Sequence, residues 1–131
     1  MLKAATAAEI DTAFAALGPL QVAALIEQSD PFFVARRQQF ALLAAHYTVP
    51  AIYEGRAFAE AGGLVSYGAS LTAVYHQVGT YVGRVLKGEK PADLPVTQPT
   101  KLELVINLIA AKAIGLSIPE PLLLRADEVI E

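Results

Sequence analysis

The hydrophobic pattern of the first half of the chain predicts strands and helices in alternation. Short continuous apolar runs are typical of strands buried on both faces of a parallel sheet, and such runs occur at residues 21–27, 49–54 and 64–68. Apolar residues spaced by three and four predict helices, and this spacing occurs over residues 8–17, 31–47, 56–63 and 70–87. Because each strand is followed by a helix, this half predicts parallel β-α-β units.

The second half of the chain predicts a connector and a strand of a different kind. Residues 89–100 are rich in proline and lack periodicity, which indicates a connector. Apolar and polar residues alternate over 101–108, which predicts a half-exposed strand at the edge of the sheet. A short helix over 110–116 and a last helix over 119–130 follow. The chain is therefore predicted to be an α/β domain, with three α-β-α layers around a mainly parallel sheet.

Composition narrows the class of protein. A chain of 131 residues with 54% hydrophobic and 18% charged residues is suited to a single folded domain with a core. The net charge of −3 and the scattered basic residues argue against nucleic-acid binding. No apolar run approaches the roughly 20 residues of a membrane-spanning helix, and we expect no signal peptide at the N-terminus. The absence of cysteine excludes disulfides, thiol catalysis and thiolate metal sites.

Candidate ligand-binding residues gather where the three apolar strands end. In open α/β sheets, ligands bind outside the carboxyl ends of the strands. Aromatic walls with a few charged groups are typical of a small-molecule site. Carboxylates are suited to an ammonium group, and arginines or helix N-termini to a carboxylate. The candidates are the carboxylates Asp30 and Glu54, the aromatic residues Phe32, Phe33, Tyr53 and Tyr67, and the arginines Arg36, Arg37 and Arg56.

Several of these candidates also have a purely structural interpretation. Asp30 precedes a proline, which is the arrangement of a helix N-cap. Neighbouring helical residues point about 100° apart, so we expect one of Phe32 and Phe33 to face away from the core. Tyr53 and Tyr67 are equally suited to packing at the end of the sheet. The residue types alone leave these alternatives open.

The sequence lacks the motifs of common enzyme classes. It contains no GxSxG, GxGxxG or GxxxxGK[ST] segment, and Ser66 and Ser70 have no histidine or acid at triad-like positions. The two histidines, His46 and His76, are too far apart for metal-ligand spacing. We therefore expect no catalysis, no bound metal and no cofactor.

Three stretches of the chain together resemble one family. They are "SDPFFVARRQQFALLAAHYTVPAIYEGRAFAEAGGLVSYGASL", "YVGRVLKGEKPADLPVTQPTKLELVINLIAAKAIGL" and "IPEPLLLRADEVIE". They are similar to the C-terminal half of the substrate-binding proteins of ABC transporters, in the family that includes tryptophan- and tyrosine-type uptake systems. The resemblance covers nearly the whole chain.

The resemblance implies a type I periplasmic binding protein, whose two α/β lobes close on a ligand. This chain would be the second lobe, and the stretches at Asp30 to Phe33, Tyr53-Glu54 and Tyr67-Gly68 would line the cleft. The implied ligand is an amino acid or similar small organic solute, the implied partner an ABC permease, and the implied location the periplasm. Gly55 stands where the family motif "YEWREF" has a large aromatic residue, and "SYGASL" replaces "SYGPSL", so the preferred solute stays unnamed.

The resemblance also implies that the first lobe, and the first strand of the second, are not part of this chain. The helix over 70–87 would normally pack on that first lobe, so its apolar stripe lacks a partner here. An exposed apolar stripe favours association, and we expect a homo-oligomer through this helix. The alternative to a fragment of an importer is thus a free-standing oligomeric module whose cleft is rebuilt between chains.

Overall fold

The computed structural model describes residues 1–99 and 101–131. Thr100, the last residue of the predicted connector, lies outside the described residues. The chain divides into two compact units, Met1–Gly68 with Glu103–Glu131 and Ala69–Leu102. No helix in the described part of the chain has the length and apolar character needed to cross a membrane.

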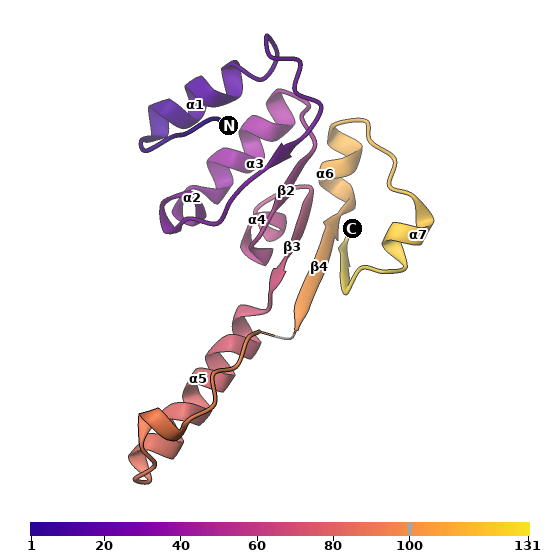
Figure 1. Cartoon of the computed structure of the whole chain (residues 1–131). Helices are drawn as coiled ribbons and strands as arrows, with labels where there is room; N and C mark the ends of the chain where they lie inside the picture. Colours follow the sequence, from indigo (N-terminus) through magenta and orange to yellow (C-terminus); the bar gives the residue numbers. More distant parts are fainter. Residues whose placement is uncertain (100) are drawn as a thin grey trace. The chain divides into compact units, whose positions relative to one another are not determined.

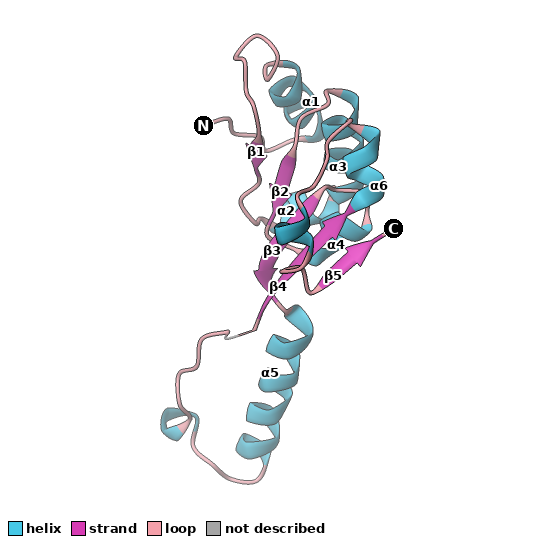
Figure 2. Cartoon of the chain, turned by 90° about the vertical axis from the view of Figure 1, so that its right-hand side faces the viewer, coloured by secondary structure: helices cyan, strands magenta, loops and turns pink. Residues whose placement is uncertain are grey.

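A five-stranded sheet in the order β1-β2-β3-β4-β5 organises the fold (Figures 1 and 2). Its strands are β1 (Leu25–Ile26), β2 (Ala51–Tyr53), β3 (Val65–Ala69), β4 (Leu102–Asn107) and β5 (Glu128–Ile130). The pairs β1–β2, β2–β3 and β4–β5 are parallel. Hydrogen bonds from Asn107 N–H to Leu64 O and from Ser70 N–H to Lys101 O join opposite ends of β3 and β4, so these two strands run antiparallel. The predicted α/β fold with a mainly parallel sheet is confirmed.

The core of the first unit lies where three helices meet β2. The helices are α1 (Ala7–Ala15), α3 (Arg37–His46) and α4 (Arg56–Glu60). Phe40 packs edge-to-face against both Phe14 and Phe58, at centroid distances of 5.6 and 6.0 Å. Figure 1 shows α1 and α3 side by side, α6 (Leu108–Ala113) directly after β4, and α7 (Glu120–Leu123) on the side of the C-terminus. The buried cluster comprises Ile10, Phe14, Leu17, Phe40, Ala44, Val49, Ala51, Tyr53 and Phe58.

The second unit consists of a long helix and the returning connector. Helix α5 (Leu71–Leu86) begins at Ser70, whose side chain accepts a hydrogen bond from the Ala73 N–H. The connector contains a short 3-10 turn, η1 (Pro91–Asp93), and contacts the helix through the Tyr81 hydroxyl, which donates to the Pro95 carbonyl at 2.7 Å. Another side of α5 carries a row of exposed apolar residues, Leu71, Tyr75, Val78, Val82, Val85 and Leu86.

Three sequence-based element assignments are wrong, and so is the burial predicted for the first strand, because β1 lies at the edge of the sheet and its Ile26 is 80% exposed. The helix predicted over 31–47 is two helices, α2 (Pro31–Ala35) and α3, because Arg36 has φ −113° and ψ 19°. The strand predicted at the sheet edge is β4, which lies between β3 and β5 and buries both Val105 and Ile106. The helix predicted over 119–130 ends at Leu123, and the chain continues into β5. Asp127 causes this last change, since its backbone and its carboxylate both pair with the Leu104 backbone at 2.8 Å.

Candidate functional site

The strands β1, β2 and β3 are mutually parallel, so their carboxyl ends lie in one row. This row of strand ends is called the sheet edge below, and it is not an edge strand. Residues 27–30 follow β1 and Glu54 follows β2, while Tyr67 lies within β3. The N–H of Glu27 donates to the Ile52 carbonyl at 3.0 Å and extends the β1–β2 ladder by one residue. The segments that the sequence singled out therefore do converge on this edge.

Asp30 is the N-cap of α2. Its Oδ1 accepts a hydrogen bond from the Phe32 N–H at 2.8 Å, and Pro31 occupies the first helical position. The side chain is also exposed, so capping occupies one carboxylate oxygen and leaves the charge accessible. The structural role predicted for Asp30 is confirmed, and its ligand contact stays a prediction.

Phe32 and Phe33 are both half-buried but have different neighbours. The Phe33 ring packs on Phe40 at 5.1 Å and also lines a cavity. The guanidinium carbon of Arg36 lies over the Phe32 ring, 5.0 Å from the ring centroid. Phe33 thus joins the core to the cavity wall, whereas Phe32 forms a cation–π contact.

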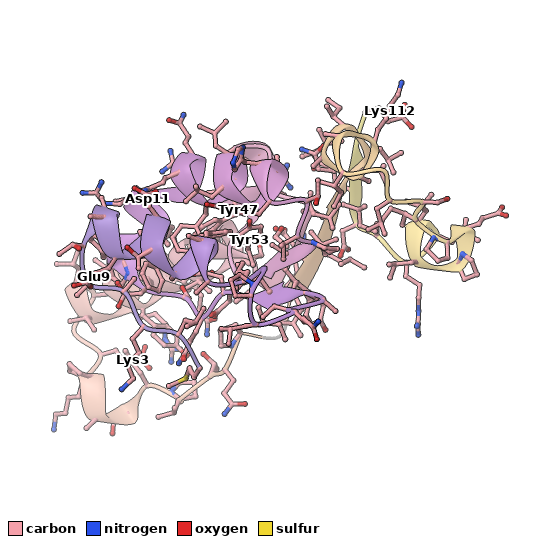
Figure 3. All side chains as sticks on the ribbon, turned by 90° about the horizontal axis from the view of Figure 1, so that it is seen from above. Lys3, Glu9, Asp11, Tyr47, Tyr53 and Lys112 are labelled. Carbon is pink, nitrogen blue, oxygen red and sulfur yellow. The ribbon has the colours of Figure 1, made fainter. Side chains whose placement is uncertain are left out.

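Tyr53 lies in the interior of the first unit (Figure 3). Its side chain is 1% exposed and its ring stacks on Phe58 at 4.7 Å. The hydroxyl is buried without a hydrogen-bond partner among the described residues. Burial, and secondarily the nearby charge of Glu27, raise the pKa of this phenol. The sequence alone did not distinguish the burial of these two tyrosines, yet Tyr53 packs in the core and Tyr67 is 51% exposed.

Gly68 fixes the distance between β3 and the turn that follows β2. A Cβ atom at Gly68 would lie 2.0 Å from the Glu54 carbonyl oxygen and 3.0 Å from the Glu54 Cγ. Only glycine allows the two backbones to approach so closely. This approach positions the exposed carboxylate of Glu54 at the sheet edge.

Glu27 is a buried carboxylate that was not among the candidates found from the sequence. The residue is 6% exposed, and neither carboxylate oxygen has a hydrogen-bond partner within residues 1–99 and 101–131. Burial is the main cause that raises the pKa of this carboxyl, and the negative charges of Glu54 and Asp30 raise it further. The Glu54 backbone amide offsets part of the rise, although it forms no hydrogen bond of ordinary geometry with the carboxylate. The sequence feature that could have identified Glu27 is its position as a charged residue directly after the apolar run at residues 22–26.

A cavity of about 600 Å³ extends from this edge along β1. Its volume lies in the range typical of small-molecule sites. Among the candidate ligand-binding residues it includes Asp30 and Phe33, but not Phe32, Tyr53, Glu54 or Tyr67. The described residues that line it are Met1, Leu2, Lys3, Ala4, Ile10, Ala13, Phe14, Leu17, Leu25, Ile26, Glu27, Gln28, Ser29, Asp30, Phe33 and Phe40.

The three candidate arginines all have partners in the protein. Arg56 pairs with Glu60 and with Glu128, each at 2.6 Å, and these carboxylates raise its pKa. Arg37 donates to the Val34 carbonyl at 3.1 Å, and Arg36 lies over Phe32. None of the three lines the cavity, whose charged side chains are Lys3, Glu27 and Asp30 among the described residues.

Comparisons with known proteins place this geometry in context. Residues 2–130 match the family model described as "ABC transporter substrate binding protein". A conserved domain protein from Vibrio cholerae O1 biovar El Tor is similar in structure, with a TM-score of 0.85, 25% identity, and coverage of 96% of this chain and 42% of that chain. An ABC domain in complex with L-Trp from Streptococcus pneumonia has a TM-score of 0.80 and 27% identity, with 94% and 40% coverage.

A third solved structure supports the fold alone. It is the ligand-free, open form of a substrate-binding protein with adhesive properties from Clostridium difficile, with a TM-score of 0.68, 19% identity, and 98% and 42% coverage. The chain thus spans about two fifths of the length of these solved relatives. No curated protein matches the chain.

Proposed function

Because the chain belongs to the family of ABC transporter substrate-binding proteins, we propose that it is the solute-binding part of an ABC importer. It binds an amino acid or similar small organic solute at the carboxyl ends of β1, β2 and β3, without catalysing a reaction. In the full-length protein the other lobe closes over this edge, and the closed form is recognised by the permease at the membrane. The family also favours a periplasmic location.

The observation that carries this proposal is the cavity beside β1. Its walls are mostly apolar, and the buried Glu27 and the exposed Asp30 and Lys3 also line it. Glu54 and Tyr67 are exposed at the same edge of the sheet and are available to a solute that extends beyond the cavity. An apolar wall with a few charged groups can both bind and orient a small solute.

A binding screen with a matched pair of variants tests the proposal. The wild-type chain is screened by ligand-observed NMR against the twenty L-amino acids and their decarboxylated amines. Asp30→Asn retains an N-capping side chain but removes the charge, so we expect affinity for the bound solute to fall about tenfold. Asp93→Asn, an equal change of charge in the turn η1, should leave affinity unchanged. No binding by any solute, or equal affinity in both variants, would contradict the proposed site.

A second candidate function rests on helix α5. Its exposed apolar residues Leu71, Tyr75, Val78, Val82 and Val85 follow the alternating spacing of four and three that forms the seam of a two-stranded coiled coil. A module that associates through this seam would bring two ligand edges into one assembly. Sedimentation velocity over a hundredfold range of concentration tests this candidate, since a monomer at every concentration would rule it out.

A further inference from the structure

Glu27 has an environment that a carboxylate seldom occupies without a partner. Its backbone is fixed by the hydrogen bond to Ile52, so the side chain leaves the sheet at the end of β1. The residue is more than nine-tenths buried, and both oxygens lack a partner in the described part of the chain. Burying an unpaired carboxylate is costly, and buried carboxylates are normally paired or hydrogen-bonded. A bound group that supplies donors would remove this cost.

The surrounding charges indicate the sign of that group. Glu54 and Asp30 lie close enough to Glu27 to disfavour its ionised form. Lys3 also lines the cavity, but it is exposed and forms no ion pair with Glu27 among residues 1–99 and 101–131. An anionic group at Glu27 would be repelled by Asp30, which also lines the cavity, and by the nearby charge of Glu54, whereas a cation would be attracted by all three carboxylates. The partner that the Glu27 carboxylate lacks is therefore a positively charged group.

The cavity wall indicates what else the ligand carries. Glu27 and Asp30 border the same space as the rings of Phe14, Phe33 and Phe40. A ligand with a cationic end at Glu27 would place its remaining atoms against these rings. An apolar or aromatic body attached to one ammonium group fits both parts of the cavity.

We infer that Glu27 anchors the ammonium group of a solute with an apolar body and selects cations over neutral solutes of the same shape. This inference rests on the proposed function, because it assigns the ligand class of that same cavity. The raised pKa of Glu27 supports it, since a bound ammonium group would stabilise the ionised carboxylate that burial disfavours. A charge-assisted hydrogen bond in a desolvated site is about twice as strong as a neutral one, so the expected preference is about tenfold or more.

Matched amine and alcohol pairs test the inference on the full chain. The probes are 2-phenylethylamine with 2-phenylethanol, tryptamine with tryptophol, and hexylamine with hexanol, each titrated by NMR into wild-type protein, Glu27→Gln and Glu120→Gln. We expect at least one amine to bind the wild type about tenfold more tightly than its alcohol. Glu27→Gln should abolish this preference, while Glu120→Gln, an equal change of charge at an exposed residue of α7, should retain it. Circular dichroism confirms that each variant is folded.

Two results would overturn the inference. One is equal affinity of the wild type for amines and alcohols, or no binding of any amine. The other is a preference for amines that survives in folded Glu27→Gln. Both leave the proposed function standing if another solute of the screen binds at the strand ends with the predicted sensitivity to Asp30→Asn. If no solute of either set binds, both proposals fail together.

Discussion

Replacing Gly68 by alanine should destabilise the protein strongly, because the new methyl group would overlap the backbone of Glu54. The added Cβ atom would lie 2.0 Å from the Glu54 carbonyl oxygen, and Cβ atoms essentially never lie closer than 3.0 Å to another heavy atom. The two strands would have to separate by about 1 Å to accommodate it. The obstacle is the backbone of the turn that directly follows β2, so no side-chain rotation can relieve the overlap.

The expected loss follows from the packing of this position. Overpacking a well-packed site typically costs about 1–3 kcal/mol. Because the overlap here is with backbone, we expect a loss of about 3 kcal/mol in the free energy of unfolding. That is a large fraction of the roughly 5–15 kcal/mol typical of a domain. It corresponds to a fall of roughly 10 °C in Tm for a chain of this size.

Urea denaturation followed by circular dichroism measures this loss. Gly79→Ala is the matched control, because Gly79 lies in α5 and the added methyl would meet no atom of the described residues within 4 Å beyond its chain neighbours and its own helix backbone. Alanine in a helix interior should raise stability by about 0.5–1 kcal/mol. Equal stability of Gly68→Ala and the wild type, within about 0.5 kcal/mol, would refute the close approach of β3 to the Glu54 turn.

Three further predictions concern buried polar groups and the exposed helix. Because burial raises the pKa of Glu27, the folded state binds the proton of this carboxyl more tightly than the unfolded state does. The stability of the wild type should therefore fall relative to that of Glu27→Gln as the pH rises above the ordinary carboxyl pKa, by about 1.4 kcal/mol for each unit between the folded-state and unfolded-state pKa. Denaturation between about pH 4 and 9 measures this difference. Tyr53→Phe removes an unpartnered hydroxyl and should leave stability unchanged or raised, whereas Tyr81→Phe loses a hydrogen bond and should cost about 1 kcal/mol; equal losses in denaturation would contradict this. Val78→Lys should abolish concentration-dependent association in sedimentation velocity, while Thr80→Lys, off the apolar row, should not.

Much of the fold could be predicted because its signals are local. The apolar runs do contain the parallel strands β1, β2 and β3, although only β2 is mostly buried and Ile26 of β1 is 80% exposed, and the helical spacing of residues 71–86 corresponds to α5. The position of β4 could not be predicted, because the strand that covers its outer side is β5. That strand follows a short helix and is held by Asp127 bonds to a residue 23 positions away. Such pairing depends on tertiary contacts that no local pattern records.

The candidate site was predicted in outline only. The cap role of Asp30 follows from the Asp-Pro pair, and the structure contains the corresponding hydrogen bond. The split between Phe33 at the cavity and Phe32 under Arg36 depends on the break at Arg36. The burial of Glu27 could not be inferred either, because charged residues are almost never fully buried. Three-dimensional packing thus decides which of the residues near the strand ends line the cavity.

The most direct test of the central claim is a map of where a solute binds. Amide resonances of the 15N-labelled chain are recorded during titration with the tightest-binding member of the screen. The account predicts that the largest shifts fall on residues 27–33, 54–56 and 67–68, at the carboxyl ends of β1, β2 and β3. Largest shifts at Gly18, Gln21 and Thr48, which line a separate hollow of about 260 Å³ and not the cavity beside β1, or no shift with any solute, would contradict it.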